Sequence, residues 1–423
     1  MITERDFNKV SEQAYLQDKK HPDYDIRAKE NDIKSFGGDT DFKVLHTINH
    51  RSGMQAMAVA PIVDGQVDTS EVVIAYAGTN SSDIQDLETD VRTVGGALTP
   101  HSLVMEIKPE TRVFGRALRS VRKSGQLHAA DAFASRIETE YPNAKITTTG
   151  HSLGEYTGLY VAAEHHFENV GFNGPDPFHV LSPEAKKWAK AHPERLMNYR
   201  NRGDFIGNFR ENRTGAGLLI DTGKKLGKFL RYHDLLAWKF GAAGNLLIPE
   251  TEENLFARMK QRNHDNFIFF QDKLKFFRLA ERRLKARNGG SLSSNAQIYL
   301  DDSKALAVVE RAQSDFVQMT SQMIQLYRVA MQDARLTWDE TFNQARSATT
   351  ELSDGEIREW LGHTGFTYRS VVRDPCNEYS ANIRELETFS ERFLDLLNQI
   401  RQKITGLVQQ DAELAEQIQG LMG

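Results

Sequence analysis

The residues best suited to chemistry in this 423-residue chain form one short run, Gly150-His151-Ser152-Leu153-Gly154. Its Gly-x-Ser-x-Gly pattern is typical of a nucleophile elbow, a tight turn from a strand into a helix that projects a serine hydroxyl. The two glycines let the strand and the helix approach each other closely. The N–H of Leu153 is then expected to face a developing oxyanion. A purely structural glycine turn is the alternative interpretation of the run.

The segments around this run alternate between strand and helix patterns. Runs at 44–49 and 54–59 flank a probable turn and predict a hairpin. The β-branched run at 72–76 predicts a strand buried on both faces. Further strands are expected at 145–149, 170–172 and 195–201, with helices at 127–141 and from the serine to residue 166. Strand, helix and strand in this order predict a parallel sheet with right-handed crossovers.

The pattern changes after Pro249. Residues 252–287 are helical in pattern, and 288–294 form the clearest linker. Apolar residues then recur at steps of three and four along two long segments, joined through 351–375, which predicts a long antiparallel helical hairpin. We therefore expect an α/β domain over 1–250, a helical connector and linker over 251–295, and an all-α hairpin or bundle over 296–423.

Composition excludes several classes of protein. The chain is 39% hydrophobic and 26% charged, with a formal charge of −5, which gives no reason to expect nucleic acid as a partner. Its single cysteine, Cys376, rules out an internal disulfide and is expected to be a small buried hydrophobe. The first residues lack the apolar segment of a signal peptide, so any export is expected to proceed without a cleaved one. No His, Cys, Asp and Glu spacing suggests a metal site, and no cofactor is predicted.

Several motifs together resemble the class 3 lipases. Residues 149–154 are similar to that family's Thr-Gly-His-Ser-Leu-Gly-Gly, and 73–79 resemble its oxyanion strand. Phe172-Asn173-Gly174-Pro175 is similar to the family's Phe-Gly-x-Pro segment. The resemblance extends over roughly residues 40–240, with the motifs in the family's order. It implies an α/β-hydrolase fold and a serine lipase or phospholipase of the A type, acting on acyl esters.

The resemblance also assigns roles. Residues 200–206 are similar to the strand end that supplies the catalytic aspartate, here Asp204, and His233 follows in the order Ser, Asp, His. Ser152 is then the nucleophile, His233 the general base, and Asp204 the group that orients the imidazole. Thr79 takes the second oxyanion-donor role, beside Leu153.

Rival residues exist for the acid and the base. Asp176 lies in a Gly-Pro-Asp-Pro loop, where a turn-capping role is the alternative. His192 precedes a proline in a probable surface turn, and His264 lies in a basic helical segment. His151, beside the serine, is interpreted as a packing residue of the elbow.

Two positions depart from the family pattern. Glu155 stands where the family has a second glycine after the serine, so the helix must pack differently on the strand, with Gly158 as a possible compensation. Ala77 stands in place of the usual arginine before Gly78. Neither change removes a catalytic group.

Two further segments suggest contact with lipid. The stretch 93–113 contains apolar residues where lipases of this kind have a lid, and a structured surface excursion is the alternative. Residues 273–287 hold seven basic residues and one acid, interleaved with Phe and Leu. Such a helix can lie on an anionic membrane, or it can bury its Phe stripe against a domain.

The C-terminal region resembles the helical LXG and W-x-G targeting domains of type VII secretion, through Ile298-Tyr299-Leu300-Asp301 and Trp360-Leu361-Gly362. This resemblance implies a secreted toxin that is cytoplasmic before export. It also implies small helical secretion partners along the C-terminal helices and an immunity protein that guards the lipase domain. Two other functions stay open: a carboxylesterase acting on soluble esters, and a hydrolase-fold interaction protein without activity.

Overall fold

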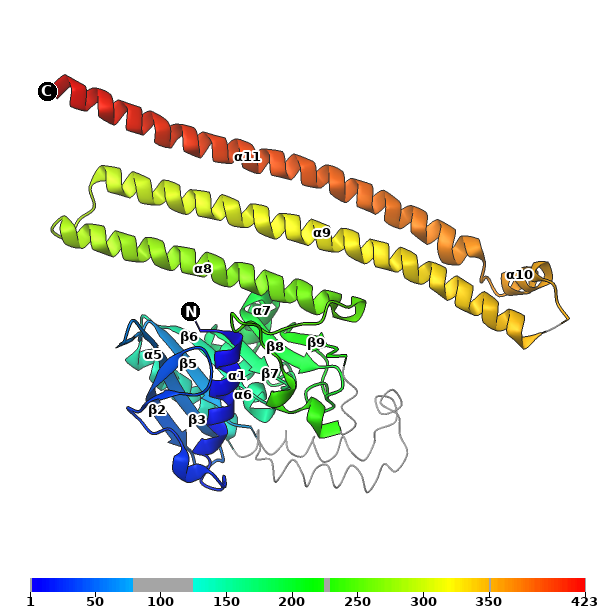
Figure 1. Ribbon diagram of the computed structural model, residues 1–423, viewed down its shortest axis with the longest axis horizontal. Helices are drawn as coiled ribbons and strands as arrows, with labels where there is room; N and C mark the ends of the chain where they lie inside the picture. Colours follow the sequence, from blue (N-terminus) through cyan, green and yellow to red (C-terminus); the bar gives the residue numbers. More distant parts are fainter. Residues whose placement is uncertain (1, 79–124, 224–228, 350, 423) are drawn as a thin grey trace. The chain divides into compact units, whose positions relative to one another are not determined.

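The computed structural model describes residues 2–78, 125–223, 229–349 and 351–422 (Figure 1). The chain divides into two compact units, Met1–His264 and Asp265–Gly423. The division falls inside a helix, α8 (Leu255–Arg287).

The first unit is built on one sheet, whose nine described strands run in the order β1-β2-β3-β5-β6-β7-β8-β9, with β4 paired to β3. Neighbours from β1 to β5 are antiparallel, whereas those from β5 to β9 are parallel. The strands are β1 Ile33–Ser35, β2 Asp41–Asn49, β3 Gln55–Val63, β4 Gln66–Val67, β5 Glu71–Tyr76, β6 Lys145–Gly150, β7 Glu168–Phe172, β8 Leu196–Asn201 and β9 Gly217–Ile220.

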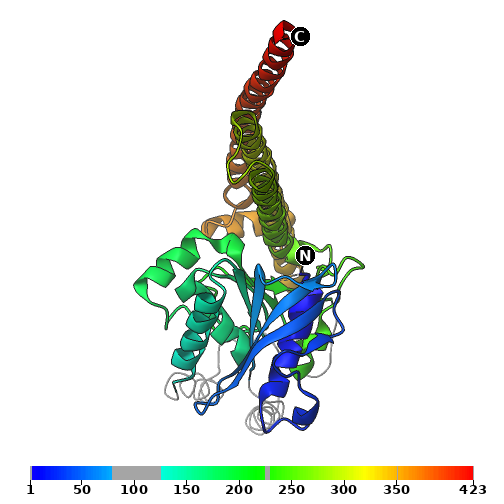
Figure 2. The same cartoon turned by 90° about the vertical axis from the view of Figure 1, so that its left-hand side faces the viewer.

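Helices cover both faces of this sheet. Their bounds are α1 Glu4–Ala14, α5 Gln126–Glu140, α6 Leu153–His165 and α7 Pro183–Ala191. One hydrophobic cluster joins α5, α6 and α7 to the sheet, and a second cluster joins α1 to the opposite face. Figure 2 shows α1, in blue, across the sheet from α5 and α6, in cyan to teal. Both faces of the central strands are therefore buried, as parallel strands require.

The expectation of an α/β N-terminal domain is confirmed. The predicted hairpin is β2 and β3, and the strand before the serine is β6, followed directly by α6. In the first unit, the strands β1, β4 and β9 and the helices α1 and α7 were not predicted. Helix α1 begins at a capping box, in which Thr3 and Asp6 each bond the other's backbone N–H.

The second unit consists of long helices, as the sequence predicts. Helix α8 is followed by α9 (Ser294–Ala348), α10 (Asp354–His363), a π-helical turn (Arg369–Arg373) and α11 (Asp374–Met422). Helices α9 and α11 are antiparallel, because Phe316 meets Phe393 while Tyr327 meets Tyr379. Near the turn of this hairpin, Cys376 is buried in a cluster with Trp338 and Val372.

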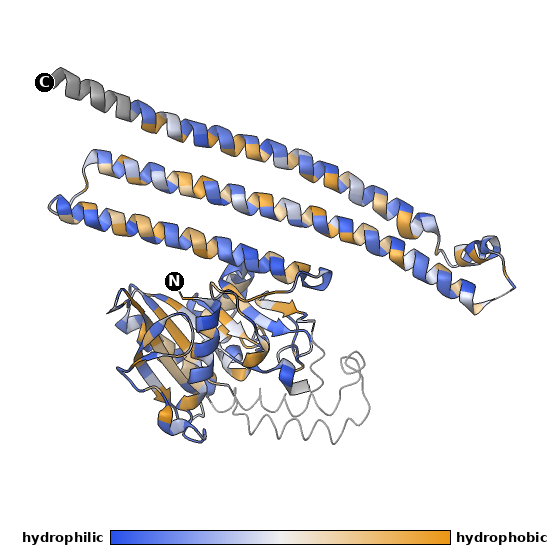
Figure 3. Ribbon diagram, in the orientation of Figure 1, coloured by the Kyte–Doolittle hydropathy of each residue, from blue (hydrophilic) through white to orange (hydrophobic). Residues whose placement is uncertain are grey.

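The predicted apolar seam on α9 is only partly buried. Val309 and Phe316 are buried, but Met319 is 47% exposed and Leu326 45%. Figure 3 shows apolar and polar residues interleaved along all three long helices. In the described part of the chain, no helix is both long enough and apolar enough to cross a bilayer.

Candidate active site

Ser152 lies at a sharp turn between β6 and α6. Its backbone has φ 60° and ψ −127°, a conformation that L-residues other than glycine rarely adopt. The turn is held on both sides: the N–H of Ser152 donates to the carbonyl of Phe172 (3.1 Å), and that of Gly154 donates to the carbonyl of His151 (2.9 Å). This strained strand–turn–helix is the geometry of a nucleophile elbow.

Glycine is required around the elbow because backbones meet there. A Cβ at Gly150 would clash with the backbone of Gly154, and one at Gly154 would clash with the carbonyl oxygen of Tyr76, at the end of β5. A Cβ at Gly78 would clash with the carbonyl oxygen of His151. The chain leaving β5 therefore runs against the elbow, and the glycines of the motif allow that approach.

Glu155 occupies the place where the resembled family has glycine, and its side chain is fully buried. A Cβ at Gly171 or at Gly174 would clash with it, so these two glycines provide the space for the larger side chain. Nδ2 of Asn169 donates to its Oε2 (3.2 Å). Burial raises the pKa of Glu155 well above its usual value, whereas the hydrogen bond from Asn169 and the charge of Arg200 lower it.

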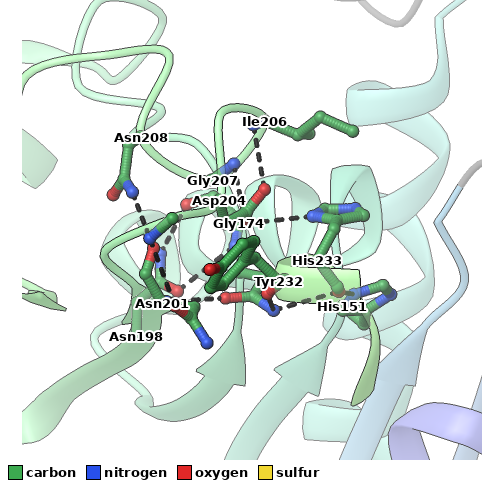
Figure 4. Close-up of polar contacts among 12 residues, drawn as sticks. His151, Gly174, Asn198, Asn201, Asp204, Ile206, Gly207, Asn208, Tyr232 and His233 are labelled. Carbon is green, nitrogen blue, oxygen red and sulfur yellow. Dashed lines mark hydrogen bonds and ion pairs between the residues drawn. The ribbon is translucent and has the colours of Figure 1, made fainter. Parts of the chain in front are cut away.

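His233 and Asp204 come together as a buried pair. Nδ1 of His233 lies 3.0 Å from Oδ2 of Asp204, and both side chains are at most 5% exposed. The backbone N–H groups of Ile206 and Gly207 donate to the same carboxylate, at 2.9 and 3.0 Å. Figure 4 shows these contacts. The backbone of the loop therefore holds the carboxylate in place, and the carboxylate in turn fixes the position and orientation of the imidazole.

This pairing defines the proton arrangement on the imidazole. Because a carboxylate only accepts hydrogen bonds, Nδ1 of His233 carries a proton, and in the neutral ring Nε2 is then the acceptor. Among the described residues, Nε2 is buried and has no hydrogen-bond partner. The ring of His151, the residue before Ser152, lies 4.6 Å from the ring of His233, centroid to centroid. The base is therefore next to the elbow with a free acceptor atom.

Asn173, just after β7, holds the loop that carries His233. Its Nδ2 donates to the carbonyls of Tyr232 (3.2 Å) and His233 (3.0 Å), and its Oδ1 accepts from the N–H of Asn201 (3.0 Å). Its φ of 53° lies in the left-handed region, which asparagine tolerates better than most residues. Sequence reasoning quoted this residue within a motif but gave it no role.

The rival residues have other partners. Oδ2 of Asp176 accepts from the N–H and the hydroxyl of Thr214 (2.9 and 2.6 Å), which ties two loops together. Nδ1 of His192 lies 3.4 Å from the carboxylate of Glu194. Nδ1 of His264 lies 2.8 Å from the carbonyl of Glu194, and burial lowers the pKa of His264 to about 4. Neither histidine is paired with an aspartate as His233 is.

Of the two predicted oxyanion donors, Leu153 lies within the described residues. Leu153 is the first residue of α6, where backbone N–H groups have no acceptor within the helix, so its N–H is available to an anion. Thr79 and the possible lid at 93–113 lie outside the described residues. In the ranges that are described, no three His, Cys, Asp or Glu side chains gather as a metal site would need.

The fold and the site can be compared with known proteins. No family model matches the chain, and no curated protein does. Among solved structures, similar chains include the Rhizomucor miehei lipase propeptide complex, at 17% identity, covering 51% of this chain and 67% of that one with a TM-score of 0.31.

Two other solved structures are similar at the same level. The mono- and diacylglycerol lipase from Aspergillus oryzae is 13% identical over 60% of this chain and 88% of its own, with a TM-score of 0.31. The lipase from Rhizopus microsporus var. chinensis is 13% identical over 50% and 72%, with a TM-score of 0.29. These values are too low to support a function, which has to rest on the geometry of the site.

Proposed function

We propose that the protein is a serine ester hydrolase that cleaves acyl esters of glycerophospholipids. The observation that carries the proposal is the buried His233–Asp204 pair, because the ring of His233 lies 4.6 Å from the ring of His151, the residue before the strained turn at Ser152. A strained turn at a serine, close in the fold to an imidazole that a carboxylate orients, has a clear chemical use in nucleophilic catalysis.

The proposed reaction has two halves. Oγ of Ser152 attacks the ester carbon while Nε2 of His233 takes its proton, and the N–H of Leu153 stabilises the oxyanion. The C–O bond to the alcohol then breaks, and His233 returns the proton to the leaving oxygen. A water molecule, deprotonated by the same imidazole, attacks the acyl-serine. The carboxylic acid leaves as Oγ regains its proton. Asp204 stabilises the imidazolium in both halves.

A fluorophosphonate probe tests this proposal directly, because phosphonylation requires an activated serine. We expect rapid labelling of the full-length protein at one site, identified by mass spectrometry of the peptide that contains Ser152. Heat-unfolded protein is the control and should not react. Absence of labelling in the folded protein would favour the silent interaction protein instead.

The preference for phospholipid is supported by one face of α8. Phe269 and Phe276 are 66% and 65% exposed, and Leu279 is 43% exposed. Arg283 and Arg287 follow Phe276 by seven and eleven residues, so helical periodicity places them on the same face. The alternative interpretation was that the Phe residues of this helix are buried against a domain. The exposed rings of Phe269 and Phe276 do not fit that interpretation. We propose that this face contacts an anionic lipid surface.

Flotation with lipid vesicles tests the contact. The protein should bind vesicles of phosphatidylcholine mixed with phosphatidylglycerol more tightly than phosphatidylcholine alone, because the arginines are attracted to anionic lipid. Arg283→Gln should weaken binding by about 5-fold, since one basic residue near such a surface contributes about 1 kcal/mol.

The control is Arg278→Gln, two residues after Phe276 and thus on the other side of the helix, which should bind as the unchanged protein does. If both variants lose vesicle binding to the same extent, the net charge of the helix and not this face would explain the binding. If vesicle binding is absent while soluble esters are cleaved, the carboxylesterase alternative is favoured. Type VII export, small helical partners and an immunity protein stay predictions of the sequence.

A further inference from the structure

Hydrogen bonds link Tyr15, in the N-terminal segment, to His151 and His151 to the proposed base, His233. Tyr15 follows α1 directly, and its hydroxyl lies 2.7 Å from Nδ1 of His151. Nε2 of His151 lies 2.6 Å from the carbonyl oxygen of His233. Figure 4 shows His151 next to His233. These residues are far apart in the sequence, so the fold alone brings them together.

The direction of both hydrogen bonds can be deduced. A carbonyl oxygen only accepts, so Nε2 of His151 carries a proton and donates to His233. Burial lowers the pKa of His151 well below its usual value, and the nearby His233 lowers it further, so the ring is neutral. Its Nδ1 is therefore an acceptor, and the Tyr15 hydroxyl donates to it.

The hydroxyl of Tyr15 is suited to this donor role. Burial raises its pKa well above the usual value, and Asp234, close to the pair, raises it further. The hydroxyl also lies 3.3 Å from the carbonyl oxygen of His151, a second acceptor on the same residue. Tyr15 thus stays protonated and fixes the His151 ring in one tautomer and one orientation.

Two consequences follow for the base. The carbonyl of His233 accepts from both His151 (2.6 Å) and Asn173 (3.0 Å), so the main chain of the base is held from two sides. The ring beside the base, 4.6 Å away, is uncharged. A charged ring there would oppose the imidazolium that His233 becomes during the proposed reaction.

We propose that Tyr15 and His151 are positioning residues for His233. They hold the backbone of the base in place and keep a neutral ring beside it. This inference rests on the proposed ester hydrolysis for its kinetic consequence, but the hydrogen-bond series can be tested without any activity.

The kinetic test compares three variants on a soluble p-nitrophenyl ester. Tyr15→Phe should lower kcat roughly 10-fold, because small misplacements of a catalytic group have large effects on rate. His151→Leu, which removes the donor to His233, should lower kcat by roughly 10- to 100-fold. His151→Gln keeps an N–H near the position of Nε2 and should restore most of the loss. KM should change little in all three.

Tyr24→Phe is the matched control, because the Tyr24 ring stacks with Arg27 and, in the described part of the chain, makes no hydrogen bond or ring contact with His151 or His233. It should leave kcat unchanged. If Tyr15→Phe and His151→Leu also keep the original kcat and the original rate of fluorophosphonate labelling, the positioning role is wrong.

NMR of ¹⁵N-histidine-labelled full-length protein separates this inference from the proposed function. The His151 signals, assigned with His151→Gln, should show the Nε2–H tautomer and no titration around neutral pH. In Tyr15→Phe that tautomer should no longer dominate. A protein without esterase activity but with these signals refutes the proposed function and keeps the hydrogen-bond series. A titrating His151 overturns the series itself.

Discussion

Replacing Ser152 with alanine is expected to lower kcat for ester cleavage by about 10⁴- to 10⁶-fold, since the nucleophile of a Ser-His-Asp site has effects of this size. The fold should be unaffected, because the hydrogen bonds that hold the turn, donated by the N–H groups of Ser152 and Gly154, use only backbone atoms. The measurement is the release of fatty acid from phospholipid and of p-nitrophenol from a soluble ester.

Ser152→Gly provides a second inactive variant with a different stability. The positive φ of residue 152 disfavours both serine and alanine but not glycine. Thermal unfolding should therefore show the glycine variant to be at least as stable as the alanine variant. If Ser152→Ala keeps more than a trace of activity on both substrates, another residue is the nucleophile.

Replacing Asp204 with asparagine is expected to lower kcat by about 10³- to 10⁴-fold. A neutral amide cannot stabilise the imidazolium of His233. The carboxylate oxygens also accept from the N–H groups of Ile206 and Gly207, and an amide has only one accepting atom for these donors. Steady-state kinetics on the soluble ester measure the effect.

Asp176→Asn is the matched control for this prediction. Asp176 is also a buried aspartate that accepts several hydrogen bonds, but its partners are Thr214 and the N–H of Phe178. We expect kcat to change by only a few-fold, with a loss of stability of about 1–3 kcal/mol from the donors left unpaired. The reverse result, an inactive Asp176→Asn and an active Asp204→Asn, would move the catalytic acid to position 176.

The nucleophile elbow could be predicted because all the residues that form it are contiguous in the sequence. A β-branched run, a Gly-x-Ser-x-Gly turn and a helix-compatible stretch are contiguous, and each glycine is required by a close backbone approach. The choice of Asp204 and His233 needed the family order as well. Their 3.0 Å contact joins positions separated by 29 residues, which no spacing rule in the sequence specifies.

The roles of Tyr15 and Asn173 could not be predicted. Tyr15 is 136 residues from His151, and no local pattern marks the pair. Helix α1, which leads to Tyr15, carries a capping box in Thr3 and Asp6 and has Phe7, Val10 and Ala14 on one face, but this pattern does not say which part of the fold the face packs against. Burial against the sheet, which only the fold provides, stabilises it.

The helical hairpin shows a different limit of sequence reasoning. Heptad spacing correctly predicts long antiparallel helices, because Phe316 and Tyr327 of α9 meet α11 in that order. It does not say how much of the seam is covered. Met319 and Leu326 belong to the same spacing pattern as Phe316 but are only about half buried. The spacing of apolar residues identifies one face of a helix, but it does not identify what packs against that face.

The buried side chain of Glu155, behind the elbow, couples three positions of the sequence. Glu155 fills space that Gly171 and Gly174 leave empty, so the volume of these three residues is shared. A larger residue at 171 or 174 is tolerable only if position 155 shrinks, and a glycine at 155 alone would leave a void. Changes at these sites should therefore accumulate as compensating sets during evolution, which makes the trio a marker for recognising distant relatives with the same packing.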